Sequence, residues 1–244
     1  MNLMSYDVLL EDQMDTCKPF GNPDTAKILV IGHDPRLQRS DIQAQYAFFL
    51  DYLKESPSTH PSERRKYDFA SLVVTYIQFL KGASVSLEEI FVSNLCNKFL
   101  NRPLGGGTVL IPDEEAKWGI QAIEDIMSIG SFKVVLPMAP QVFYHLVKLG
   151  FITNPDDNLL TFLRGARPSP AASVRKAYVP VGRSPFLSVC GRMFYHRKDR
   201  VPVIPIVHVK QWPLGTRMKP HYSSPMKLAA ANAKDCLTSP QSLN

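Results

Sequence analysis

The run AKILVIG at residues 26–32 constrains the fold more than any other part of the sequence. It is apolar, contains β-branched residues and stops at a glycine, which is typical of a strand buried on both faces. Similar runs at 88–95, 131–139 and 201–209 are separated by stretches long enough for crossover helices, and strands joined in this way pair in parallel. The sequence therefore predicts a three-layer α/β/α sandwich with a four-stranded parallel sheet.

Four segments between these runs have the apolar spacing and end signals of helices: 40–53, 64–82, 112–130 and 139–150. Ser40 is the expected N-cap of the first, and the other three close at glycine. From 153 to 200 the periodicity weakens and prolines accumulate, so we expect an irregular insertion before the last strand.

The length of 244 residues fits one doubly wound domain. We expect a single domain over 1–220 and a loosely ordered C-terminal tail over 221–244, with at most a short helix around 225–233.

The net charge of +6 is unevenly distributed. Residues 164–219 contain eight arginines and four lysines but one acid, Asp199. This segment is either a solvated basic face or a surface that binds phosphates.

The four cysteines, Cys17, Cys96, Cys190 and Cys236, form no C-x-x-C pair. The pattern therefore signals neither a zinc site nor an iron–sulfur cluster. We expect reduced thiols, no metal and no cofactor. With no leader pattern and no apolar run of membrane length in the sequence, the expected location is cytoplasmic, without a membrane partner.

Polar residues follow the predicted strands at the edge where parallel sheets bind ligands. The first strand runs into Gly32-His33-Asp34-Pro35, the second ends with Asn94, and the last contains His208. A carboxylate, an amide and an imidazole at one rim form a set that can polarise and hydrolyse a bond. Each also has a structural interpretation: Asp34 as part of a turn, Asn94 as a turn or cap residue, His208 as a packed histidine.

These motifs resemble those of the uracil-DNA glycosylase superfamily. KILVIGHDPRLQ is similar to the family's Gly-x-Asp-Pro motif after the first strand, and IFVSNLCNKF has an Asn late in a central strand. VVLPMAPQVFYHL is similar to the next core unit, and His208 corresponds to the start of the last motif. The resemblance spans about residues 26–215 and implies a uracil-DNA glycosylase-like fold.

The resemblance also implies roles for individual residues. Asp34 would orient or activate the attacking water, and its loop would be shaped by Gly32, His33 and Pro35. Asn94 would read the edge of an extruded pyrimidine, and His208 would hydrogen-bond the base as negative charge develops on it. An aromatic should stack on the base: Tyr46 and Phe48 are the nearest candidates, although packing in a helix core is the alternative for both.

The last motif departs from the family pattern, because Val209, Lys210, Gln211 and Trp212 replace the residues that normally follow the histidine. Lys210 can neutralise a phosphate, and Trp212 can wedge or stack, or can be a partly buried loop aromatic. We expect Lys210, Trp212 and Arg217 to contribute to DNA binding.

The sequence thus predicts a monomeric base-excision enzyme that hydrolyses the N-glycosidic bond of uracil or a related damaged base in DNA. The first alternative is a non-catalytic nucleic-acid or protein-binding module on the same fold. The second is a small-molecule hydrolase or nucleotide-binding protein, which fold analogy alone supports.

Overall fold

The computed structural model describes residues 17–33, 45–57, 59–98, 111–153, 159, 162, 186–209 and 220–239. Its strands are β1 (Ile28–Gly32), β2 (Ile90–Asn94), β3 (Val134–Pro137), β4 (Phe194–Tyr195) and β5 (Pro202–Val203). The helices are the 3₁₀ segments η1 (Ala47–Lys54) and η2 (Leu87–Glu89) and the α-helices α2 (Pro61–Lys81), α3 (Asp113–Ile129), α4 (Pro140–Lys148) and α7 (Pro220–Thr238).

The five strands form one sheet in the order β2-β1-β3-β5-β4. The pairs of β1 with β2, β1 with β3 and β3 with β5 are parallel. The predicted α/β class is confirmed, but the prediction of a purely parallel four-stranded sheet is wrong, because β4 adds an antiparallel edge to β5. The turn at 196–201 folds the chain back between them, and a two-residue strand is too short to show an alternating pattern in sequence.

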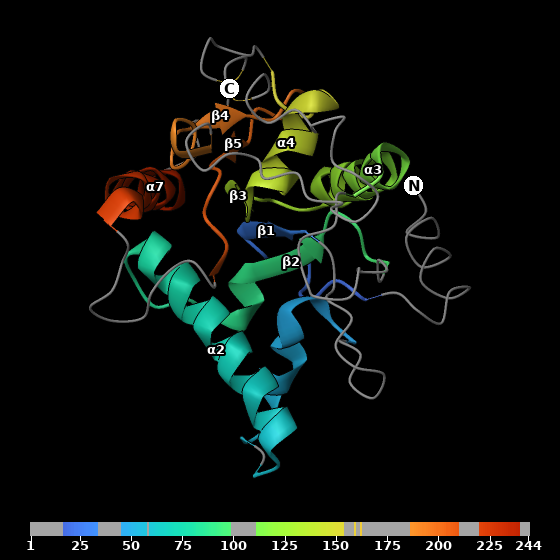
Figure 1. The fold of residues 1–244 in the computed structure, drawn as a ribbon, viewed down its shortest axis with the longest axis vertical. Coiled ribbons are helices and arrows are strands. Elements are labelled where there is room, and N and C mark those ends of the chain that lie inside the picture. Colours follow the sequence, from blue (N-terminus) through green and yellow to red (C-terminus); the bar gives the residue numbers. More distant parts are fainter. Residues whose placement is uncertain are drawn as a thin grey trace, which may run out of the picture.

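Helices cover both faces of the sheet (Figure 1): α3 and α4 lie on one side, and α2 and α7 lie on the other. Every residue of β1 and β2 is buried, as expected for strands enclosed by two helical layers. Among the described helices, none combines the length and the hydropathy needed to span a lipid bilayer.

Three of the predicted helices are confirmed as α2, α3 and α4. Helix α2 has Pro61 in its first turn and ends at Gly82, whose left-handed backbone (φ 70°) suits glycine. Helix α3 opens with Asp113, Glu114 and Glu115, whose charges complement the helix dipole.

The predicted helix at 40–53 is corrected over its described part. Residues 47–54 form the 3₁₀ segment η1, in which Phe48 and Phe49 have left-handed backbones (φ 58° and 57°). This conformation interrupts regular helix hydrogen bonding. It accompanies the packing of the Phe48 ring on Phe69 of α2, with centroids 6.2 Å apart and planes 4° from parallel.

The C-terminal segment also differs from the expected loose tail. Residues 220–238 form the 19-residue helix α7, which is packed beside α2 (Figure 1). Met226, Ala229 and Ala233 are fully buried on its inner face. Their spacing of three and four residues gives α7 the apolar stripe of a docked helix.

Candidate functional site at the carboxyl edge of the sheet

The ends of β1 and β2 bring two of the predicted site residues onto the same rung. Gly32 and Asn94 are register partners, and the Leu95 amide donates to the Gly32 carbonyl at 2.8 Å. In parallel strands, partner residues direct their side chains to the same face. The Asn94 side chain therefore lies directly beside the Gly32 backbone.

A larger residue at position 32 would displace its neighbours. A Cβ built on Gly32 would lie 2.4 Å from Asn94 Oδ1 and 2.5 Å from Phe48 Cε2, so both side chains would have to move. An aromatic ring and an amide oxygen therefore meet over the end of β1. The glycine is explained by this close approach, since its φ is not positive.

Phe48, rather than Tyr46, is the aromatic at this rung. The Tyr46 ring instead packs edge-to-face on Phe20, with centroids 6.3 Å apart and planes at 89°. The sequence names both aromatics as candidates but cannot separate them, because the left-handed turn at Phe48 reverses the directions expected for a regular helix.

Asn94 is 4% exposed, yet its side chain makes no hydrogen bond within the described part of the chain. Its backbone amide, by contrast, donates to Asn97 Oδ1 at 3.4 Å. A buried amide group normally satisfies its donors and acceptor. Within the described chain, Asn94 Oδ1 instead faces the Gly32 backbone.

His33 follows β1 and is held from two sides. Its carbonyl accepts a hydrogen bond from the Cys96 amide at 3.0 Å, and its Nε2 lies 2.5 Å from Gln141 Oε1 in the first turn of α4. This contact ties the loop that starts at His33 to α4. The sequence analysis assigns no role to Gln141; its position beside Pro140 at a helix start was the available signal.

Ala139, the N-cap of α4, has a φ of 127° and a ψ of 153°, a region occupied almost only by glycine. Its amide donates to the Ile206 carbonyl at 3.1 Å. Backbone strain of this kind persists only where the surroundings enforce it, and it is concentrated at functional sites.

His145, one turn after Gln141, is fully buried, and neither of its ring nitrogens has a hydrogen-bond partner among the described residues. Burial lowers the pKa of His145 to about 4, although the Asp113 carboxylate opposes this shift. Asp113 Oδ1 is 3.7 Å from His145 Nδ1, while its Oδ2 accepts a hydrogen bond from Lys148 Nζ at 2.5 Å. His145 is therefore a neutral imidazole near neutral pH.

His208 lies just beyond the same edge. Ile206 pairs with Met138, which directly follows the last residue of β3, so His208 is two residues past the final rung. It is half-buried. The remaining predicted site residues lie outside the described residues: Asp34, Pro35, Lys210, Trp212 and Arg217.

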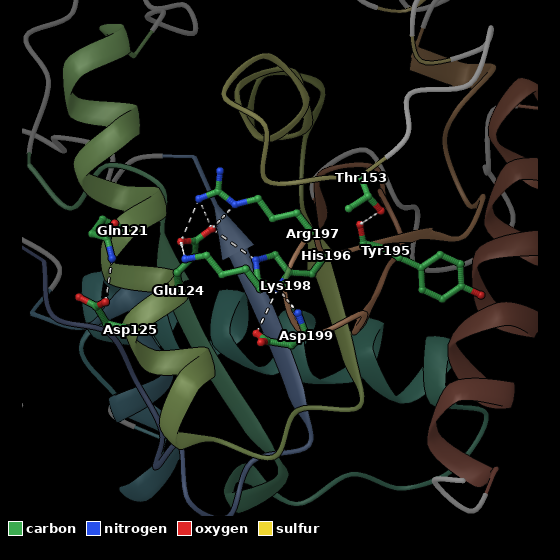
Figure 2. Close-up of polar contacts among 9 residues, drawn as sticks. All are labelled: Gln121, Glu124, Asp125, Thr153, Tyr195, His196, Arg197, Lys198 and Asp199. Carbon is green, nitrogen blue, oxygen red and sulfur yellow. Dashed lines mark hydrogen bonds and ion pairs between the residues drawn. The ribbon is translucent and has the colours of Figure 1, made fainter. Parts of the chain in front are cut away.

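The opposite edge of the sheet carries a second polar cluster, centred on Glu124 of α3 (Figure 2). This carboxylate is buried and accepts hydrogen bonds from Arg197 Nε at 3.1 Å and Lys198 Nζ at 2.6 Å. The His196 ring lies between two carboxylates, with Nε2 3.4 Å from Glu124 Oε1 and Nδ1 3.1 Å from Asp199 Oδ2.

These contacts affect the acidity of Glu124. Burial alone would raise the pKa of Glu124, but hydrogen bonds from Lys198 and His196 and the charge of Arg197 outweigh it and hold the pKa below its usual value. Arg197 and Lys198 belong to the basic segment 164–219 of the sequence analysis. In the structure, both neutralise the buried carboxylate of Glu124.

Among the residues that the structure describes, no three His, Cys, Asp or Glu side chains are arranged to hold a metal ion. Comparison with protein-family models and with curated proteins gives no match to this chain.

Proposed function

We propose that this protein removes uracil or a related damaged base from DNA, on a fold like that of the uracil-DNA glycosylases. The observation that carries the proposal is the meeting of the Phe48 ring and Asn94 Oδ1 over Gly32. A ring face supplies stacking and an amide supplies edge recognition, which are the two contacts that an extruded base requires.

Asn94 is suited to reading a pyrimidine edge. A pyrimidine offers adjacent donors and acceptors, and an amide side chain can pair with one of each. In the described chain the Asn94 side chain has no hydrogen bond that a base would have to displace, so a base gains these contacts without breaking others.

The proposed reaction is hydrolysis of the N-glycosidic bond. A water oxygen bonds to C1′ of the deoxyribose while the bond from C1′ to the base nitrogen breaks, and its electron pair leaves on the base. Asp34 orients the water and takes its proton, and His208 hydrogen-bonds the departing base anion. The contact between His33 and Gln141 supports this assignment, because it fixes the residue next to Asp34.

DNA would be held through cationic residues of the segment 164–219, with Lys210 and Arg217 on phosphates and Trp212 as a wedge or stacking group. Arg197 and Lys198 are left out of this surface, since their charges are paired with Glu124.

The test is release of free base from uracil-containing oligonucleotides, single- and double-stranded, followed by chromatography. We expect release by the wild type and a loss of at least about a hundredfold in Asp34→Asn and in His208→Ala. The matched controls are Asp125→Asn, at an exposed position of α3, and His60→Ala, at an exposed position before α2. Both should retain wild-type rates. No release by the wild type refutes the enzymatic proposal. Salt-sensitive DNA binding without release would instead favour the non-catalytic binding module.

A further inference from the structure

The backbone of the last strand leaves the sheet immediately before His208. The Ile204 and Ile206 amides still donate to β3 and its extension, at Val135 O (2.9 Å) and Pro137 O (3.0 Å), and the Ile206 carbonyl accepts from Ala139. From Val207 onward, the sheet supplies no further hydrogen bonds in the described chain. A backbone that leaves a sheet inside the protein needs other partners for its polar groups.

A buried side chain of α2 supplies a hydrogen bond at Val207. The Tyr76 hydroxyl donates to the Val207 carbonyl at 3.0 Å and lies 3.4 Å from Met226 Sδ of α7. Tyr76 therefore holds the carbonyl of the residue that precedes His208.

Helix α7 contacts the turn at Gly191, which is bonded to the last strand. Gly191, next to Cys190, has a φ of 79°, and a Cβ on it would lie 2.2 Å from the Pro225 carbonyl oxygen of α7. Asn232 of α7 donates to the Gly191 carbonyl at 2.8 Å, and the Gly191 amide donates to Pro205 O at 2.8 Å. The helix is therefore joined to the last strand through a turn that admits only glycine.

We propose that Tyr76 is a positioning residue for His208: its hydroxyl, supported by α7, fixes the Val207 peptide and thereby the direction in which His208 leaves the sheet. The inference rests on the proposed function, in which His208 contacts the departing base. Displacement of a catalytic group by about 1 Å from a change outside the reacting centre can cost up to about a hundredfold in rate.

The test compares Tyr76→Phe, which removes the hydroxyl and keeps the ring, with Tyr195→Phe, which removes an exposed hydroxyl that donates to Met193 Sδ. Imidazole signals are recorded by heteronuclear NMR, and His208 is assigned by its absence from His208→Ala. We expect the His208 signal to shift or broaden in Tyr76→Phe and to keep its wild-type position in Tyr195→Phe. Asn232→Ala, which removes the α7 hydrogen bond to Gly191, should move the signal in the same way and provides a second variant if Tyr76→Phe folds poorly.

Base release is the second measurement. In single-turnover assays we expect Tyr76→Phe to lower the rate between about tenfold and a hundredfold without changing oligonucleotide affinity, and to have no further effect in the His208→Ala background. An unchanged His208 signal in both Tyr76→Phe and Asn232→Ala overturns the inference. If the wild type releases no base but the signal shifts, the proposed function fails and the positioning role stands.

Discussion

A histidine is buried at each edge of the sheet, but the groups around its ring nitrogens differ. At the amino edge, both nitrogens of His196 face carboxylates, and the neighbouring Glu124 is hydrogen-bonded by Arg197 and Lys198. At the carboxyl edge, His145 has no hydrogen-bond partner on either nitrogen within the described chain, and the buried Asn94 side chain faces the Gly32 backbone.

Backbone geometry follows the same division. Ala139 at the carboxyl edge has the glycine-like φ of 127°, whereas Arg200 at the amino edge has a φ of 57°, within the left-handed region that turn residues adopt. Satisfied polar groups stabilise a fold, while backbone strain and unsatisfied buried groups are concentrated at functional sites. The comparison therefore agrees with the proposed function, which places the chemistry at the carboxyl edge.

The largest expected effect is on stability at the amino edge. Glu124→Gln leaves Arg197 and Lys198 without their counter-charge. It should lower the free energy of unfolding by about 3 kcal/mol, the lower end for a broken buried ion pair, because both cations can turn toward water. Urea denaturation at neutral pH measures this loss. Asp125→Asn, one residue along and exposed, should change it by less than about 0.5 kcal/mol. Equal effects of the two changes would contradict a structural role for the cluster around Glu124.

The pH dependence of stability tests whether His145 is buried in its neutral form. The pKa of His145 is about 4 in the folded protein, below its ordinary value of 6.5. The unfolded chain therefore takes up the proton first as pH falls, and stability is lost between about pH 6.5 and pH 4. Replacing His145 with Phe should remove about 2 kcal/mol of this loss, measured by thermal or urea unfolding across that range. Identical pH profiles for the two proteins would contradict a neutral, buried His145.

A smaller effect is expected at Ala139. Glycine adopts its backbone conformation without strain, so Ala139→Gly should raise the free energy of unfolding by about 1 kcal/mol. The control Ala122→Gly, within α3, should lower it by about 1 kcal/mol, because glycine disfavours a helix interior. If both changes destabilise the protein, the carboxyl edge holds no strain at this residue.

Much of the fold follows from local patterns. Apolar runs that end at glycine or asparagine mark β1 and β2, and caps with glycine mark the ends of α2 and α3. The misjudged elements depend on tertiary contacts. Strand β4 pairs with β5, and its Tyr195 carbonyl also accepts from the Thr153 amide. Helix α7 contains Pro225 and few local helix signals, and it is stabilised instead by packing beside α2, where Tyr76 contacts Met226.

The site is predictable to a lesser degree. Strand-end position suffices to bring Gly32, His33 and Asn94 together, because parallel strands end at a shared edge. Strand-end position does not distinguish Phe48 from Tyr46, because that choice depends on a left-handed turn. It also does not identify Gln141 or Tyr76, whose partners lie 108 and 131 residues away in sequence.

The most direct test is the rate of uracil release per folded molecule, compared between Asn94→Ala and Glu124→Gln. We expect the wild type to release uracil, Asn94→Ala to lose at least about a hundredfold because the base edge is no longer read, and Glu124→Gln to retain the wild-type rate despite its lower stability. Absence of release from the wild type, or equal losses in the two variants, would contradict a reactive site at the carboxyl edge of the sheet.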